Sequence, residues 1–403
     1  MAQEFDVIVV GAGMSGATLA CALGEVGFRV ALLDKKPARV WQEQNYDPRV
    51  SSINLASQKI FESLGVWQAI QRRRVSPFRE IRVWTRDGAI HFSANEISQT
   101  HLGHIIENSA ITTALLEVLS NSENITVLQP TDIKQLSCDD HGVSVITEAH
   151  GKLHGSLLVG ADGATSRVGE AADITKSIQR YGQKAIVATV HTEKNHAQTA
   201  WQRFLATGPL AFLPLADGLC SIVWSCDNAM ADNVLALDDA SFMRDLTEAF
   251  EYRLGAIVET SPRQAFPLAR QDTTSYIGEH TVLIGDAAHV IHPLAGLGAN
   301  LGITDAACLA QVLSAARGKK RDIGAHATLR RYERWRKGDN ALVSNAMDMY
   351  KNIFGSSSDT LRRVAGSGLN LANRISPVKH TLMRHATGIS GDLPDIARQS
   401  TIH

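Results

Sequence analysis

The first part of the chain alternates between apolar runs and a segment of small residues. Residues Phe5 to Val10 are an apolar, β-branched run that ends at Gly11, and Ser15 to Gly24 follow with helical character. A second apolar run, Arg29 to Leu33, ends at Asp34. A strand, a glycine turn, a helix and a strand within about thirty residues are typical of a dinucleotide-binding βαβ unit. The pattern therefore predicts a cofactor site at the start of the chain.

Shorter apolar runs further along predict additional strands. Ile81 to Phe92 and Thr126 to Thr147 are broken by turn signals, which predicts antiparallel β insertions. Ala185 to His191 and Leu219 to Trp224 alternate between apolar and polar residues as half-buried strands do. These two segments predict a β-sheet domain on the substrate side.

The pattern then indicates a return to the first domain. Leu157 to Val159 run into a glycine turn, Thr281 to Ile284 form a short apolar strand, and Gly302 to Arg317 are a small-residue helix. From Leu329 onward the sequence is helical and increasingly basic. The predicted fold is α/β (α+β): a Rossmann-like domain interleaved with a β-sheet domain and followed by a helical C-terminus.

Composition narrows the functional classes. The 403 residues, 44% hydrophobic and 20% charged, fit a folded globular protein rather than a small binding module. Forty Lys and Arg against 41 Asp and Glu argue against a surface built to bind nucleic acid. Five cysteines without a C-x-x-C pair predict neither a zinc site nor a disulfide framework. No run of 18 apolar residues occurs and the first residues are acidic, so the expected location is cytoplasmic.

The first motif, residues 11 to 16, reads Gly-Ala-Gly-Met-Ser-Gly. Gly11 permits the tight turn, Gly13 lets the backbone approach a pyrophosphate, and Gly16 lets helix and strand pack closely. Asp34 is placed to accept hydrogen bonds from a ribose 2′-hydroxyl. An adenosine diphosphate moiety is the expected ligand, although this motif alone does not separate NAD from FAD.

Two later motifs bear on that question. Gly160-Ala161-Asp162-Gly163 and the run from Gly285 to His289 each place an aspartate at the carboxyl end of a strand, where ligands of open α/β sheets bind. A glycine-rich turn then feeds directly into a helix, whose start would stabilise the negative charge of a reduced flavin. On spacing alone, a plain glycine-rich turn is the alternative.

The three motifs, in this order, resemble the FAD-dependent aromatic hydroxylases of the para-hydroxybenzoate hydroxylase fold. The stretch from His292 to Asp305 is similar to the ubiquinone-biosynthesis monooxygenase signature H-P-x-A-G-Q-G-x-N-x-G-x-x-D, with Leu297 in place of Gln. Further matches are residues 47 to 51, 106 to 108, 201 to 204 and 208 to 215. The resemblance implies that Arg49 and Asn108 flank the FAD.

The resemblance also implies the reaction. NADH or NADPH reduces the flavin, O₂ adds to give a C4a-hydroperoxyflavin, and its distal oxygen attacks a polyprenylated phenol on the way to ubiquinone. The alternatives are a hydroxylase of a small soluble aromatic acid and a non-catalytic flavin-binding subunit of a biosynthetic complex. Asp162 and Arg167 are candidates to assist the reductant, and no catalytic base is identified.

These predictions assign residues to domains and to the cofactor. The FAD-binding domain takes residues 1–75, 102–178 and 270–345, the substrate domain takes 76–101 and 179–269, and 346–403 form the C-terminal helical region. The predicted cofactor-binding residues are Gly11, Ala12, Gly13, Met14, Ser15, Gly16, Asp34, Lys35, Arg49, Asn108, Asp162, Gly285, Asp286, Pro293, Gly296, Gly298, Ala299 and Asn300.

Other polar residues receive structural interpretations. His289 and His292 have no third ligand at metal-site spacing, so they are predicted to be loop histidines and no metal is expected. Arg72 to Arg74 are predicted to form a solvated helix end.

The C-terminal third carries a local excess of positive charge. Between Arg317 and Asp339 there are nine Lys or Arg and three acids, and apolar residues at partly helical spacing follow. A basic amphipathic surface of this kind can lie against anionic lipid, so we expect peripheral contact with a membrane or a membrane-bound partner. The alternative is a helix packed on the FAD-binding domain with its charges in solvent.

Overall fold

The computed structural model describes residues 3–139, 142–291, 296–354 and 359–398. Its centre is a sheet in which β19 (Thr281–Leu283), β11 (Gly151–Gly160), β1 (Gln3–Val10), β2 (Val30–Leu33) and β8 (Ile125–Leu128) run parallel in that order. The short strand β18 (Ile277–Gly278) pairs antiparallel with β19. The strand–turn–helix–strand prediction for the first residues is confirmed, with α1 spanning Met14–Glu25.

The predicted antiparallel insertion at Thr126 to Thr147 is only partly right. β8 follows α4 (Asn108–Leu119) and joins the parallel sheet beside β2, as strands after crossover helices do. Only β9 (Ile133–Asp139) and β10 (Gly142–Thr147) form an antiparallel extension, on the edge of β11.

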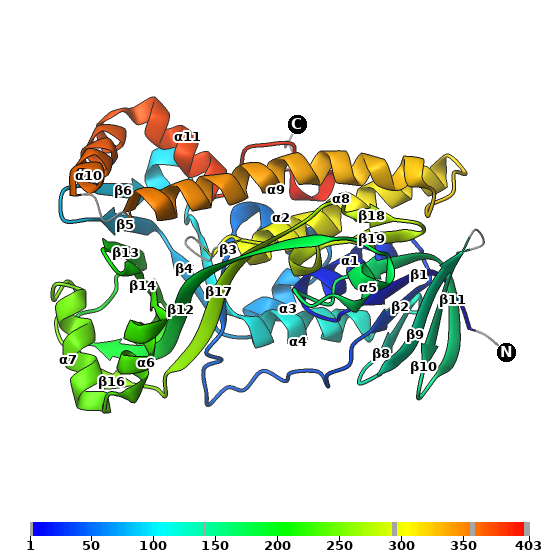
Figure 1. Ribbon diagram of the computed structural model, residues 1–403, viewed down its shortest axis with the longest axis horizontal. Coiled ribbons are helices and arrows are strands. Elements are labelled where there is room, and N and C mark those ends of the chain that lie inside the picture. The colour runs from blue at the N-terminus through cyan, green and yellow to red at the C-terminus, as the bar shows by residue number, and fades with distance from the viewer. Residues whose placement is uncertain (1–2, 140–141, 292–295, 355–358, 399–403) are drawn as a thin grey trace.

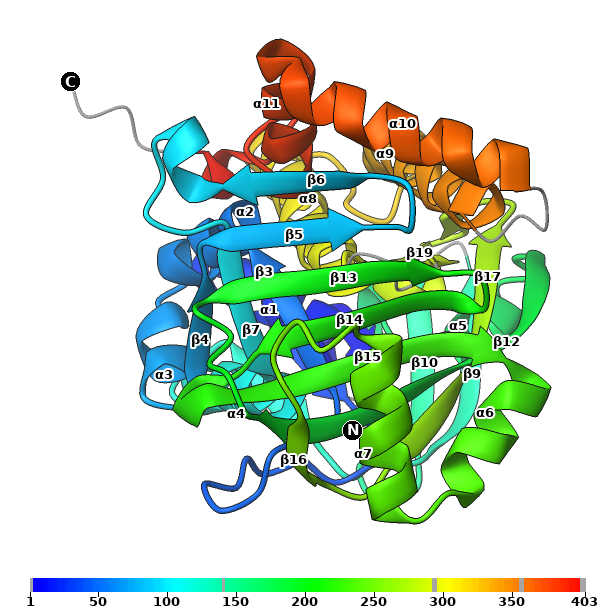
Figure 2. The same cartoon turned by 90° about the vertical axis from the view of Figure 1, so that its left-hand side faces the viewer.

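A second, nine-stranded sheet makes up the substrate side. Its strands are β20 (His289–Val290), β17 (Gln264–Thr273), β12 (Lys176–Thr192), β15 (Leu219–Asp227), β14 (Gly208–Pro214), β13 (Thr199–Leu205), β5 (Glu80–Trp84) and β6 (Ala89–Ser93), with β16 (Ile257–Thr260) pairing to β12. Figure 2 shows this sheet face-on, with α6 (Asn228–Ala236) and α7 (Asp239–Ala249) against its outer face. The long strands β12 and β17 run between the two halves of the molecule (Figure 1).

Helices and a small sheet complete the cofactor half. β3 (Val50–Asn54), β7 (Gly103–Glu107) and β4 (Val75–Phe78) form a three-stranded antiparallel sheet. α2 (Leu55–Ser63), α3 (Trp67–Gln71), α5 (Arg167–Ala171) and α8 (Gly298–Gly318) surround the sheets. α8 begins four residues before the predicted Gly302, because residues 298–301 of the signature are already helical.

The C-terminal part is helical, as predicted. α9 (His326–Phe354) lies along the top of the molecule in Figure 1, and α10 (Asp359–Arg374) and α11 (Ser376–Ala386) lie beside the edge strand β6. Asn370 accepts a hydrogen bond from Ala89 N at 3.0 Å, so α10 covers part of this edge. The interleaved α/β architecture is confirmed, and the domain boundaries stay predictions. No helix in the described ranges combines the length and apolar character needed to cross a bilayer.

Candidate active site

The three glycines of the first motif occupy different environments. Gly11 has a φ of +107°, and a Cβ there would lie 2.2 Å from the carbonyl oxygen of Ala161. A Cβ on Gly16 would lie 1.9 Å from the carbonyl oxygen of Gly11. A Cβ on Gly13 would meet no atom within 4 Å. Gly13 therefore faces open space, as a backbone that approaches a pyrophosphate requires.

Asp34 ties the end of β2 to this turn. Its Oδ2 accepts a hydrogen bond from Ala12 N at 2.8 Å, and its Oδ1 accepts one from Lys36 N at 2.8 Å. Each carboxylate oxygen keeps a lone pair that can accept a ribose hydroxyl. Lys35 is exposed and pairs with Asp132 at 3.6 Å. Its predicted contact with the cofactor stays a prediction.

Asp162 lies at the carboxyl end of β11, but its carboxylate already accepts hydrogen bonds from other groups of the protein. It accepts hydrogen bonds from Ser166 Oγ at 2.5 Å and from Arg167 N at 2.7 Å at the start of α5. The Arg167 guanidinium donates to the Ile133 carbonyl oxygen at 2.9 Å. These contacts give both residues structural roles, and their help to the reductant stays a prediction.

Three segments far apart in sequence meet at Ser15. Gly285, in the short helix η3 (Gly285–Ala287), has a φ of +57°, and a Cβ there would lie 2.6 Å from Ser15 Oγ. A Cβ on Gly302 in α8 would lie 2.3 Å from the same oxygen. The start of α1, η3 and α8 are therefore packed too closely for larger side chains.

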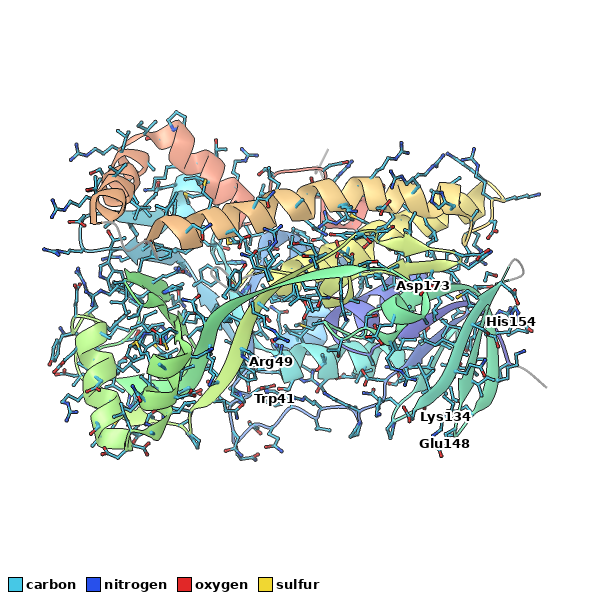
Figure 3. All side chains as sticks on the ribbon, in the orientation of Figure 1. Trp41, Arg49, Lys134, Glu148, His154 and Asp173 are labelled. Carbon is cyan, nitrogen blue, oxygen red and sulfur yellow. The ribbon has the colours of Figure 1, made fainter. Side chains whose placement is uncertain are left out.

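Asp286 and Arg49 lie close enough for their charges to interact. The Asp286 side chain is exposed to solvent, yet surrounding protein atoms desolvate it and raise its pKa, while the positive charges of His289 and Arg49 oppose that rise. The Arg49 guanidinium lies 5.9 Å from the centre of the Phe266 ring. Figure 3 shows Arg49 on the irregular segment after β2, beneath the long strands.

The start of α8 supplies amide groups at the predicted loop. Gly298, Ala299 and Asn300 are its first residues, and the first amides of an α-helix lack intrahelical acceptors. Leu297 precedes them and makes no side-chain cap. Gly296 has a φ of +61°, which glycine tolerates. Pro293 and His292 lie outside the described residues.

The buried Asn300 side chain is fully used by the protein. Its Oδ1 accepts a hydrogen bond from Asn54 N at 3.0 Å, and its Nδ2 donates to the carbonyl oxygens of Ser52 at 2.7 Å and Gly296 at 3.3 Å. The amide therefore joins β3 to the glycine-rich turn. Asn108 likewise donates through its backbone N to the Arg49 carbonyl oxygen at 2.9 Å and accepts from Ser51 Oγ at 2.7 Å.

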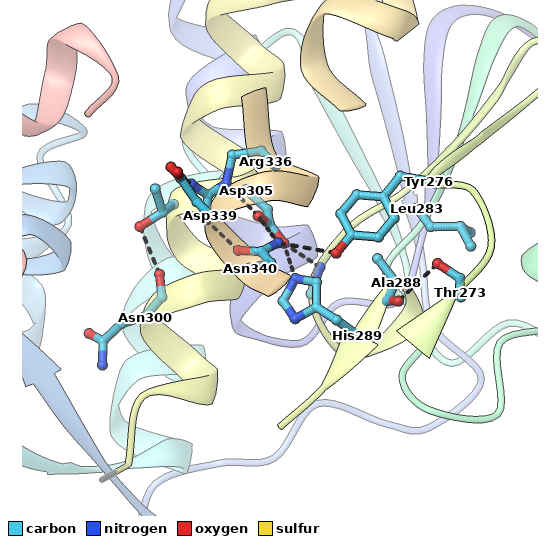
Figure 4. A network of polar contacts seen from close by, with 12 residues as sticks. Thr273, Tyr276, Leu283, Ala288, His289, Asn300, Asp305, Arg336, Asp339 and Asn340 are labelled. Atoms are coloured by element: carbon cyan, nitrogen blue, oxygen red, sulfur yellow. Dashed lines mark hydrogen bonds and ion pairs between the residues drawn. The ribbon is translucent and has the colours of Figure 1, made fainter. Parts of the chain in front are cut away.

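A buried polar network beneath the site was not predicted (Figure 4). Asp305, fully buried in α8, accepts hydrogen bonds from Arg336 Nε at 2.7 Å and Gly285 N at 3.1 Å and pairs with His289 Nε2 at 2.6 Å. Burial alone would raise the pKa of Asp305, but the charges of His289 and Arg336 outweigh it and hold the pKa below its ordinary value. His289 lies on β20 rather than in a loop, so that prediction is wrong. The sequence did contain one sign of this network, because Asp305 is the last residue of the signature.

The prediction for Arg72 to Arg74 is also wrong in part. Arg72 is exposed and pairs with Glu117, as expected of a solvated residue. Arg73 and Arg74 are mostly buried, and Arg74 pairs with the buried Glu107 at 2.9 Å. The acidic partner lies 33 positions away, so the basic run gave no sign of it.

These features fit a bound FAD. The open space at Gly13, the Asp34 carboxylate, the accessible Asp286 carboxylate and the amides at the start of α8 suit a pyrophosphate, a ribose, a polyol and an anionic ring, respectively. In the described ranges, no three His, Cys, Asp or Glu side chains gather where they could hold a metal ion. All five cysteines are free thiols.

Comparisons with known proteins agree with this geometry. The family model described as "FAD binding domain" matches residues 4–341. The chain is 35% identical to "Ubiquinone hydroxylase UbiL" of Rhodospirillum rubrum, over 95% of this chain and 89% of that protein. It is 32% identical to "3-demethoxyubiquinol 3-hydroxylase" of Escherichia coli, over 96% of this chain and 99% of that protein.

Solved structures show the same fold. p-Nitrophenol 4-monooxygenase PnpA from Pseudomonas putida superposes with a TM-score of 0.79 at 18% identity, covering 96% of this chain and 98% of that one. PqsL of P. aeruginosa, in complex with 2-aminobenzoylacetate, gives a TM-score of 0.76 at 22% identity, covering 91% of this chain and 100% of that one. At these identities the likeness concerns the fold alone.

Proposed function

Because this chain belongs to the FAD-dependent monooxygenase family that includes the ubiquinone-biosynthesis hydroxylases, we propose that it hydroxylates the ring of a polyprenylated phenol, with NAD(P)H as reductant and O₂ as oxidant. FAD supplies the electron transfer and the oxygen chemistry when bound. The protein contributes binding, orientation and exclusion of water.

The face of the substrate sheet that is turned toward the cofactor half carries this proposal. Cross-strand pairing puts Ala185 beside Phe266, and Val223 beside both Val187 and Ala211, on one face. The Arg49 guanidinium lies over Phe266, which supports this face as the one toward the proposed FAD site. These five paired positions are apolar, which suits a neutral phenol with an apolar tail.

An aromatic carboxylate would need a cation on that face. The opposite face of the sheet packs Phe212, Ile222 and Trp224 against α6 and α7, so it is closed to substrate. Arg49 lies over this face from the cofactor half and is close enough to Asp286 to influence its pKa. Arg270, on the same face of β17 as Phe266, already pairs with Asp272 at 2.5 Å and with Asp348. The hydroxylase of a small aromatic acid is therefore less well supported than the prenylated phenol.

The chain's own groups would hold the flavin during the reaction. The backbone amides of Gly298 and Ala299, at the start of α8, would stabilise negative charge on the reduced ring. The accessible Asp286 carboxylate would accept a hydrogen bond from the ribityl chain.

Substrate-dependent NAD(P)H oxidation tests the proposal. The FAD-loaded protein should consume NAD(P)H and form hydroxylated product with prenylated phenols, and should do so poorly with phenolic acids. Preferential turnover of the acids would favour the small-acid alternative. FAD binding without substrate-dependent consumption of NAD(P)H by either class would favour the non-catalytic subunit.

We further propose that α9, α10 and α11 bring the enzyme to an anionic membrane surface where such a substrate dissolves. Arg331 and Arg334 are exposed on α9, while Arg336 is buried against Asp305 and Lys337 donates to the Thr274 carbonyl oxygen. The basic excess is therefore smaller than the sequence suggests. Further along the same helices, six apolar side chains are exposed: Leu342, Met349, Val364, Leu371, Ile375 and Leu382.

A further inference from the structure

Glu107, the last residue of β7, is a buried carboxylate that four donors share. Its side chain is 2% exposed. It accepts hydrogen bonds from Arg74 Nε at 2.9 Å and Nη2 at 3.0 Å, from Trp41 Nε1 at 3.0 Å, and from Asp47 N at 2.7 Å. Two of these donors belong to the segment 41–49, which contains no helix or strand. Glu107 therefore fixes a segment that has no regular hydrogen bonding of its own.

Arg74 uses its remaining donors on the same segment. Its guanidinium donates to the carbonyl oxygens of Gln42 at 2.9 Å, Glu43 at 2.7 Å and Asn45 at 2.9 Å. It also lies 3.8 Å from the centre of the Tyr46 ring. A planar guanidinium with five N–H donors can make such a set of contacts, whereas the ammonium of lysine cannot.

The anchored segment ends at Arg49, one of the predicted cofactor-binding residues. The Asp47 side chain accepts hydrogen bonds from Arg49 N at 2.9 Å and Ser109 N at 3.2 Å. The Arg49 carbonyl oxygen accepts one from Asn108 N, next to Glu107. On the other side, Tyr46 Oη donates to the Ala216 carbonyl oxygen at 3.2 Å in the substrate half. The segment thus joins the two halves of the molecule beside the FAD site.

We propose that the Arg74–Glu107 pair positions segment 41–49, and with it Arg49, for binding FAD. A buried ion pair is an inefficient way to stabilise a core, because desolvation offsets most of its attraction. It does specify one arrangement of the backbone that it binds. When only a fraction of molecules hold the segment in the competent arrangement, the apparent affinity for FAD falls by that fraction.

The test compares FAD affinity in matched variants. Arg74→Lys and Glu107→Gln remove the multiple contacts but keep the side-chain size, and Arg72→Lys and Glu117→Gln are controls on the neighbouring exposed pair. The dissociation constant of FAD is measured by flavin fluorescence, with protease cleavage within 41–49 as a second readout. We expect FAD to bind about 10- to 100-fold more weakly in the first two variants, the range for lost hydrogen bonds to a charged group. The controls should stay within about twofold.

A milder variant covers the case in which the first two fail to fold. Trp41→Phe keeps an aromatic ring beside Arg74 and removes only the Nε1 donor to Glu107. It should bind FAD more weakly than the wild type and expose segment 41–49 to protease in the FAD-free protein, with FAD restoring protection. Wild-type FAD affinity and wild-type protection in every variant that folds would overturn the proposal. Because the readout is FAD binding, this outcome is independent of whether prenylated phenols are substrates.

Discussion

Single residues of this molecule show that the same residue type serves different purposes within a few positions. Gly13 has a φ of −71°, which alanine also adopts, and open space where a Cβ would lie. Gly13→Ala should therefore fold normally but place a methyl group where the pyrophosphate approaches. We expect unchanged thermal unfolding of the FAD-free protein and FAD affinity lowered about tenfold or more, a loss of about 1.4 kcal/mol. Gly16→Ala, whose methyl would overlap Gly11, should instead fail to fold; a Gly13→Ala protein with wild-type FAD affinity would contradict this role.

His104 should make the molecule sensitive to acid. Its ring is buried against Trp67 at 5.1 Å, its Nδ1 has no partner among the described residues, and burial, with a smaller effect from His101, lowers its pKa to about 3. The unfolded chain takes up this proton near pH 6.5, so stability is retained above pH 6.5 and decreases as the pH falls toward 3. At about 1.4 kcal/mol per pKa unit, the loss is on the order of 5 kcal/mol. Urea unfolding at several pH values should show a flatter decline for His104→Gln than for the wild type.

At the scale of elements, α8 and α9 are joined through one buried carboxylate. Asp305→Asn would remove the buried counter-charge of the Arg336 guanidinium and leave it only the exposed carboxylate of Asp339. We expect it to lower the free energy of unfolding by about 3–5 kcal/mol. Asp339→Asn is the matched control, since Asp339 also contacts Arg336, at 3.3 Å, but is 51% exposed and should cost at most about 1 kcal/mol. Equal effects of the two substitutions in denaturant unfolding would mean that burial does not set the contribution of this network.

The same elements show what a sequence does and does not reveal. The βαβ unit, the strands of the substrate sheet and the basic helical C-terminus follow from local patterns, since apolar spacing and glycine turns are local. Other features depend on residues that are distant along the chain. They are the pairing of β8 with β2 and the ion pairs Arg74–Glu107 and Asp305–Arg336. A basic residue is predicted to be solvent-exposed unless the acidic residue that pairs with it in the interior is known. For this reason the sequence predicted neither the Asp305 network nor the anchoring of segment 41–49. Among the site residues, Asn300 and Asp162 lie where they were predicted, but their side chains bind protein groups.

At the scale of the whole molecule, the exposed surface of α9 to α11 leads to a prediction about membranes. Each Lys or Arg close to an anionic surface contributes about 1 kcal/mol, screened over about 8 Å at physiological salt. We therefore expect the protein to sediment with anionic liposomes at low salt and to be released at high salt.

Two pairs of substitutions test which surface is responsible. Arg331→Glu with Arg334→Glu, both exposed, should reduce the binding at low salt. Leu371→Ser with Val364→Ser, both exposed, should reduce the liposome binding that persists as the salt concentration rises. Arg244→Glu on α7 is the control for charge away from these helices, because the Arg244 side chain is 62% exposed and pairs with its sequence neighbour Asp245. Its reversal should have little effect. Binding that is absent at low salt, or equally reduced by Arg244→Glu, would argue against docking through these helices, while leaving FAD binding and hydroxylation to be judged by their own assays.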